Sequence, residues 1–152
     1  MNKVVESITS WADNVLSKKY PEFNNLPACP FARRALEDKK VKIKFPPVCV
    51  SEDLESLKEI EVVIYVFDKY LIDSLKLSEL AEQINKDYPC IVALEDHPDD
   101  IEQIGNVVLN QGEYALLLIQ RRDKLQEARK HLKKMGYYNN WSKDYYEDVV
   151  NR

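Results

Sequence analysis

Three short segments of the chain are almost continuously apolar, and they constrain the fold more than any other feature of the sequence. They cover residues 61–67, 90–94 and 114–119. Runs of this length and character are typical of strands that are covered on both faces. In a fourth run, Val41, Ile43 and Phe45 alternate with lysines, which predicts a half-buried edge strand that ends at Pro46-Pro47.

Segments with helical periodicity separate these strands. Pro89 ends one of the helical segments, and Gly136 is well placed to cap another. The expected helices cover residues 4–16, 29–36, 77–88 and 125–135, with a short acidic helix after Pro47 and a last helix in the tail.

Strands that are separated by helices predict an α/β fold. We expect a single domain over residues 1–152, with about four strands in a mostly parallel or mixed sheet that helices cover. Residues 98–109 are ambiguous, because Ile101, Ile104 and Val108 have helical spacing whereas Gly105 favours a strand. We predict a helix for this region.

The composition is that of an ordinary globular domain. The 152 residues, 45% of them hydrophobic and 32% charged, suit a chain with one hydrophobic core. The first residues lack the uninterrupted apolar stretch of a signal peptide or a membrane span. Cys29, Cys49 and Cys90 include no C-x-x-C pair, which fits a reducing compartment. We therefore expect a cytoplasmic protein that has no membrane segment.

The net charge and the low glycine content argue against two kinds of binding function. The formal net charge of -4 disfavours nucleic-acid binding. With only three glycines, the chain is not expected to form a glycine-rich phosphate loop. Arginines and lysines nevertheless concentrate in a predicted basic helix at residues 121–135. A solvated helix face is the simpler interpretation of this stripe, and a phosphate-rich partner is the alternative.

Cys29 is the main candidate for chemistry. If Pro30 occupies the first helical position, Cys29 becomes the N-cap, where unpaired backbone N–H groups and the helix dipole favour a thiolate. Arg33 and Arg34 lie one turn further on and add positive potential, so we expect a lowered pKa for Cys29. The alternative is an ordinary buried cysteine in an apolar corner.

A second group of candidates lies where the predicted strands end. Asp68 follows the first buried strand, residues 95–97 follow the second, and Arg121 and Arg122 follow the third. If the strands are parallel, these ends share one edge of the sheet, so a carboxylate, the His97 imidazole and a guanidinium could converge. A turn histidine before proline is the simpler interpretation of His97. The spacing matches no specific metal motif, and no cofactor is indicated.

The chain resembles a bacterial domain-of-unknown-function family. Its members begin with a tryptophan-bearing helix, followed by a leucine and the motif C-P-F-A. These elements stand here as Trp11, Leu26 and Cys29-Pro30-Phe31-Ala32, and the later order is similar, with a leucine-rich helix at residues 75–84, His97-Pro98 and a strand-end Arg121. The segment between Trp11 and Cys29 is longer here than in the family. The resemblance implies an enzyme-like pocket around Cys29, His97 and Arg121, but it implies no particular reaction.

Two functions follow as hypotheses. The first is a small cytosolic enzyme, or enzyme-like binder, that acts on an anionic small molecule. In this hypothesis, Cys29 is the nucleophile or the anion-site cap, and His97 is the general acid or base. The anion is bound by Arg33, Arg121 and Arg122. The alternative is a non-catalytic protein-interaction module that uses the basic helix and the tyrosine-rich tail after Gly136. The tail tyrosines could instead cover the core, which is the interpretation we favour.

Overall fold

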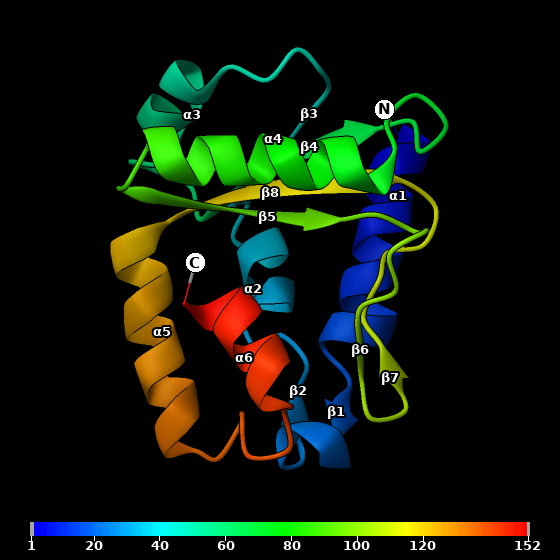
Figure 1. Ribbon diagram of the computed structural model, residues 1–152, viewed down its shortest axis with the longest axis vertical. Helices are drawn as coiled ribbons and strands as arrows, with labels where there is room; N and C mark the ends of the chain where they lie inside the picture. Colours follow the sequence, from blue (N-terminus) through cyan, green and yellow to red (C-terminus); the bar gives the residue numbers. More distant parts are fainter. Residues whose placement is uncertain (1, 152) are drawn as a thin grey trace.

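A four-stranded mixed sheet lies at the centre of the computed structural model, which describes residues 2–151 (Figure 1). The spatial order of its strands is β3-β4-β8-β5. β3 and β4 are parallel, whereas β8 is antiparallel to both of its neighbours. The predicted α/β class is therefore confirmed. The strands are β3 (Val41–Lys44), β4 (Val62–Phe67), β5 (Ile91–Asp96) and β8 (Ala115–Arg121).

Helices cover both faces of this sheet (Figure 1). α3 (Val50–Ser56) and α4 (Ser74–Asp87) lie on one face. On the other face lie α1 (Asn2–Trp11) with its π-helical extension η1 (Ala12–Leu16), α2 (Ala32–Glu37), α5 (Arg122–Lys134) and α6 (Lys143–Val150). None of the helices that residues 2–151 form combines the length and the apolar composition needed to cross a bilayer.

The α4 face of the sheet is packed with apolar side chains. Val63 and Tyr65 of β4 and Leu117 of β8 are fully buried there against Leu77 and Ala81 of α4. These side chains share a face because alternate residues of a strand point the same way. The opposite face holds Val62, Ile64 and Leu116, which pack on Val4 and Ile8 of α1.

The outer edge of β5 is paired by a side chain instead of a strand. The Asn85 amide of α4 donates to the Ala93 carbonyl (2.9 Å), and its oxygen accepts from the Ala93 N–H (2.7 Å). Asn85 thereby occupies backbone groups that would otherwise be open to strand pairing with another chain.

Residues 98–109 form a hairpin, so the predicted helix is wrong. β6 (Gln103–Ile104) pairs with the antiparallel β7 (Val107–Val108), and Gly105 opens the turn between them with a φ of +56°. A glycine followed by one residue is typical of two-residue hairpin turns, because glycine adopts positive φ without a Cβ clash. The local turn chemistry therefore outweighs the helical spacing of the apolar residues.

The tyrosine-rich tail packs against the body, as we predicted. Tyr137 is buried beside Phe23, with ring centroids 5.0 Å apart, and Trp141 lies 6.0 Å from Phe23 in an edge-to-face arrangement. Tyr138 and Tyr145 add to the same cluster. The cluster joins η2 (Pro21–Phe23) and the hairpin strands β1 (Lys19–Tyr20) and β2 (Leu26–Pro27) to the end of the chain.

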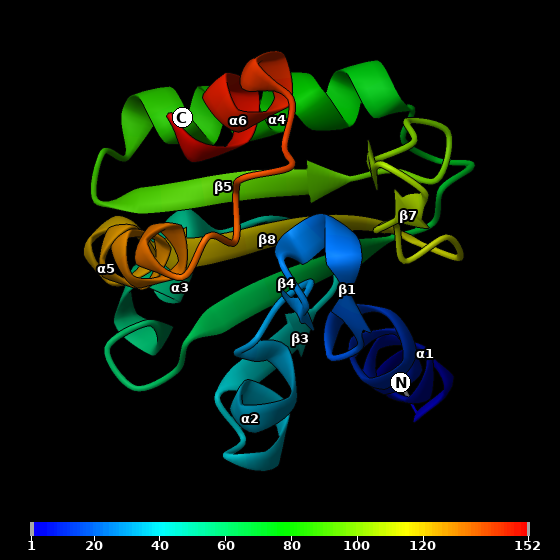
Figure 2. The ribbon, with the colours of Figure 1, turned by 90° about the horizontal axis from the view of Figure 1, so that it is seen from below.

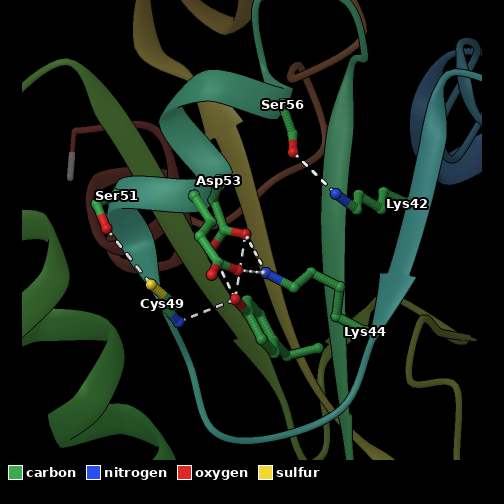
Figure 3. A network of polar contacts seen from close by, with 8 residues as sticks. Lys42, Lys44, Cys49, Ser51, Asp53 and Ser56 are labelled. Atoms are coloured by element: carbon green, nitrogen blue, oxygen red, sulfur yellow. Dashed lines mark hydrogen bonds and ion pairs between the residues drawn. The ribbon is translucent and has the colours of Figure 1, made fainter.

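A buried polar network fastens α3 to the sheet (Figure 3). The Lys44 ammonium of β3 lies 2.9 Å from the carboxylate of Asp53, which is fully buried in α3. The Tyr65 hydroxyl donates to the same carboxylate (2.9 Å) and accepts from the Cys49 N–H (3.0 Å). Burial acts to lower the pKa of Lys44, but its contacts with Tyr65 and Asp53 outweigh burial and raise the pKa well above the ordinary value. Lys44 is therefore a permanent cation in this network.

We predict that Tyr65→Phe lowers the free energy of unfolding by about 1–3 kcal/mol, because it removes one hydrogen-bond donor from the buried Asp53 carboxylate and the acceptor of the Cys49 N–H. Urea unfolding at neutral pH measures the change. Tyr70→Phe is the matched control, since Tyr70 is 85% exposed, and it should have an effect within about 0.5 kcal/mol. Equal effects of the two substitutions would contradict a structural role for the network.

Candidate functional site

A cavity of about 710 Å³ opens on the α1 face of the sheet. Its floor is formed by Val62 and Ile64 of β4 and Leu118 of β8. α1 with η1, α2 and α5 form its walls; Figure 2, seen from below, shows these helices on the side of the sheet that faces the viewer. A concave, largely apolar space of this volume is typical of small-molecule sites.

The cavity exists because α2 does not fill the space beside α1. α2 contains no fully buried residue, and its side chains Ala35 and Leu36 are half-buried where they line the cavity. Leu118 and Val41 on the floor are also only half-buried, although they lie on strands of the central sheet. Apolar surface is therefore exposed inside the fold.

Charged side chains surround the mouth of the cavity. Arg121 and Lys124 lie at the end of β8 and the start of α5, and His131 lies further along the same helix. Lys124 is 3.9 Å from Glu61, and Arg121 makes a bidentate pair with Asp123, with N–O distances of 2.6 and 3.1 Å. The remaining charged side chains that line the cavity are Arg34, Asp38, Lys40 and Glu127.

Cys29 lines this cavity, but it is not the N-cap of a helix as we predicted. α2 begins at Ala32, and its N-cap is Phe31. The Cys29 sulfur still lies near backbone N–H groups, because Phe31 and Ala32 donate to it, and these contacts lower the pKa. Burial has the larger effect and raises the pKa of the Cys29 thiol above its ordinary value. The predicted lowering of this pKa is therefore wrong.

Arg33 and Arg122 are engaged in structural contacts. The Arg33 guanidinium lies 3.4 Å from Asp13, so it joins the surface of α2 to η1, and Arg33 is not among the residues that line the cavity. Arg122 donates from Nε to the Pro89 carbonyl (2.8 Å) and from Nη2 to the Ile91 carbonyl (3.1 Å). Arg122 thereby braces the beginning of β5.

His97 lies in a different part of the molecule. Its Nε2 is 2.8 Å from the Ile72 carbonyl oxygen, and its Nδ1 accepts from the Asp99 N–H at 3.1 Å. These contacts fit the neutral tautomer that carries its hydrogen on Nε2. The residue is only 2% exposed. Nε2 therefore joins the loop after β5 to the loop after β4, and Nδ1 stabilises the loop that carries His97.

The strand directions separate His97 from Arg121. Arg121 is paired with Ile91 at the beginning of β5, whereas His97 follows Asp96 at its end. At about 3.3 Å per residue, the five steps from Ile91 to Asp96 span roughly 16 Å. The predicted convergence at one sheet edge required a parallel third strand, and the antiparallel β8 excludes it. The structure brings Cys29 and Arg121 to one cavity and leaves His97 outside its lining.

Two carboxyl groups at and after the end of β5 have raised pKa values, the buried Asp96 and the half-buried Glu102. Asn110 donates to Asp96 (2.7 Å), and burial raises the pKa of Asp96 although this contact and one from the Gln111 N–H lower it. Burial likewise raises the pKa of Glu102, and its acidic neighbours add to the increase, while a hydrogen bond with Tyr145 opposes it. Among residues 2–151, no group of three or more Asp, Glu, His or Cys side chains is arranged to hold a metal ion.

Lys124 and His131 also line the cavity, although neither was predicted as a site residue. With Arg121 and Ala128 they recur at intervals of three or four residues, so they lie on one side of α5. This spacing is a readable signal for a shared face. The cavity that this helix face borders cannot be predicted from the sequence, because it depends on how α2 packs.

Comparison of the chain with protein-family models, with curated proteins and with solved structures gives no match. The resemblance to the C-P-F-A family therefore stays a prediction.

We predict that iodoacetamide alkylates Cys29 more slowly than the exposed Cys90 at every pH between about 6 and 9, because Cys29 is less exposed than Cys90 and burial raises the pKa of its thiol. Intact-mass measurements on two variants that each retain a single one of these thiols, both with Cys49→Ser, give the two rates. Faster reaction of Cys29 below neutral pH would contradict the assignment of a protonated thiol.

We predict that Glu102→Gln increases the free energy of unfolding at neutral pH. The raised pKa means that the folded state favours the protonated side chain, so the ionised form costs stability above that pKa. The gain should shrink as the pH falls through the raised value and the wild-type carboxyl group becomes protonated. Urea unfolding over this pH range measures the difference, and the exposed Glu127→Gln serves as the matched control. A gain that grows towards acidic pH would contradict the prediction.

Proposed function

We propose that this protein is a cytoplasmic binding protein for an anionic small molecule with an apolar body, which occupies the cavity between the sheet, α1, α2 and α5. The observation that carries the proposal is that an apolar cavity of about 710 Å³ is lined by cationic residues, among them Lys124 of α5. An elongated carboxylate or phosphate ester matches both features.

The apolar walls support an apolar ligand body. Trp11 and Leu16 from the first helix and Leu125 from α5 face the same space as the strand residues Ile64 and Leu118. Each methylene group that such walls remove from water contributes about 0.8 kcal/mol, which corresponds to roughly a fourfold change in Kd. Affinity should therefore increase with ligand chain length until the cavity is full.

The charges at the mouth support an anionic head group. Four cationic side chains, Arg34, Lys40, Arg121 and Lys124, line the cavity with three acidic ones, in a chain whose net charge is -4. The Lys124 side chain is 48% exposed, so an incoming anion can reach its ammonium group. Ammonium and guanidinium groups both form charge-assisted hydrogen bonds with carboxylates and phosphates.

The geometry favours binding over nucleophilic catalysis. The pKa of Cys29 is raised, and His97 uses both ring nitrogens in a separate loop contact. Cys29 then forms part of the cavity wall, and its protonated sulfur contacts the apolar body of the ligand. A protein-docking role for the tyrosine-rich tail has less support, because Tyr137 and its neighbours pack into the body.

We predict that octanoate, decanoate and dodecanoate bind with increasing affinity, by isothermal titration calorimetry. Lys124→Gln should weaken decanoate binding by about tenfold, because it removes a charged hydrogen-bond donor from the cavity lining, and it should affect decanol much less. Lys130→Gln on the exposed side of α5 is the matched control and should bind decanoate like the wild type.

Leu118→Trp tests the location of the ligand. A tryptophan on the cavity floor should abolish decanoate binding, whereas Val108→Trp on the exposed β7 should leave it unchanged. Bound decanoate should also slow the alkylation of Cys29 without slowing that of Cys90. Decanoate binding that survives Leu118→Trp in a folded protein would overturn the proposal.

A further inference from the structure

Four large apolar side chains are strongly exposed on two loops that follow strands of the sheet. Tyr70 and Leu71 are each 85% exposed in the loop after β4, Leu75 is 67% exposed in the first turn of α4, and Ile101 is 58% exposed in the loop after β5. We call these four residues the loop patch. Single exposed apolar residues are normal, but a group of them marks an interaction surface.

The two loops are held side by side. β4 and β5 end at the same end of the sheet, where β8 begins (Figure 1). The buried His97 bridges the loops through its contact with the Ile72 carbonyl (2.8 Å), one residue after Leu71. His97 therefore positions the loop patch.

Local hydrogen bonds fix the loop that carries the two most exposed residues. The Tyr70 N–H donates to the Asp68 carboxylate (2.9 Å), and Asp73 caps α4 by accepting from the Lys76 N–H (2.8 Å). A loop that is ordered before binding loses little conformational entropy when a partner covers it. Tyr70 and Leu71 are consequently presented as preformed anchors.

The loop patch has an acidic border. Residues 68–75 and 97–102 contain five acidic side chains and a single lysine. Asp99 is 81% exposed at the side-chain level, so its charge is available to a partner. Complementary charges around an apolar centre steer association and select the partner. The border therefore favours a cationic partner and repels anionic surfaces.

We propose that the loop patch docks a basic, amphipathic segment of another protein, with Tyr70 and Leu71 as the apolar anchors and the acidic border as the selector of positive charge. A symmetric contact between two copies would place the acidic borders against each other, which disfavours it. An anionic membrane is disfavoured by the same charges. This proposal is independent of the ligand in the cavity.

The test is an NMR titration of the ¹⁵N-labelled protein with a synthetic helical peptide made of lysine and leucine. Amide shifts confined to residues 69–75 and 98–101, with affinity that falls at higher salt, are the expected result. Two control peptides, one with glutamate in place of lysine and one with serine in place of leucine, should bind at least about tenfold more weakly, because each lacks one of the two recognised features.

Variants separate the loop patch from the rest of the surface. Leu71→Ser should weaken binding of the lysine–leucine peptide by about tenfold, because it removes a central apolar anchor. Met135→Ser, which changes another exposed apolar residue, should leave the affinity unchanged. Asp99→Asn should weaken the binding and reduce its salt dependence, whereas Glu55→Gln in α3 should not.

Three outcomes would overturn the proposal. They are peptide shifts spread over other surfaces, equal effects of Leu71→Ser and Met135→Ser, and self-association that Leu71→Ser abolishes in analytical ultracentrifugation. The last outcome would assign the loop patch to a second copy of this chain. Thermal unfolding of each variant checks that it is folded, which is expected because Leu71 and Asp99 are exposed.

Discussion

The structure depends on the pairing of β8 with both β4 and β5. β8 pairs through residues 115–120 with β4 on one side and through residues 116–121 with β5 on the other, and it is antiparallel to both. β4 and β5 therefore run in the same direction with a strand between them, and α4 crosses over β8 to connect them. The ends of β4 and β5 lie together, while β8 ends at the other end of the sheet (Figure 1).

This pairing gives the two ends of the sheet different surfaces. The end of β8 leads into α5, whose residue Lys124 lines the cavity. The opposite end carries the loops that His97 holds together, with exposed apolar residues and acidic neighbours. The two faces of the sheet differ as well. α3 and α4 pack closely on one, and α1, α2 and α5 leave space on the other.

Much of the fold could be predicted because its signals are local. The apolar runs, the prolines at strand and helix ends and the helical spacing in residues 77–88 are each decided by neighbours in the sequence. Gly136 follows α5 with a φ of +78°, as a helix-capping glycine does. The hairpin at β6 and β7 was also signalled locally by Gly105, but the competing helical spacing of Ile101 and Ile104 led to the wrong assignment.

The candidate site could be predicted only in part. Cys29 and Arg121 were singled out and do border one cavity, but His97 does not, because its place depends on the direction of β8. The buried pair of Lys44 and Asp53 gave no signal, since a lysine in an edge strand and an aspartate in an acidic helix look solvent-exposed in a sequence.

The sequence by itself determined most of the secondary structure, the apolar strands that form the core and the α/β class, because hydrophobic periodicity is a local property of the chain. Only the tertiary structure decided the order and direction of the strands, and with them which charged residues meet. An apolar strand is buried almost equally well beside different partner strands, so burial alone does not select the strand order. The order is set by hydrogen bonding and packing between residues that lie far apart in the chain.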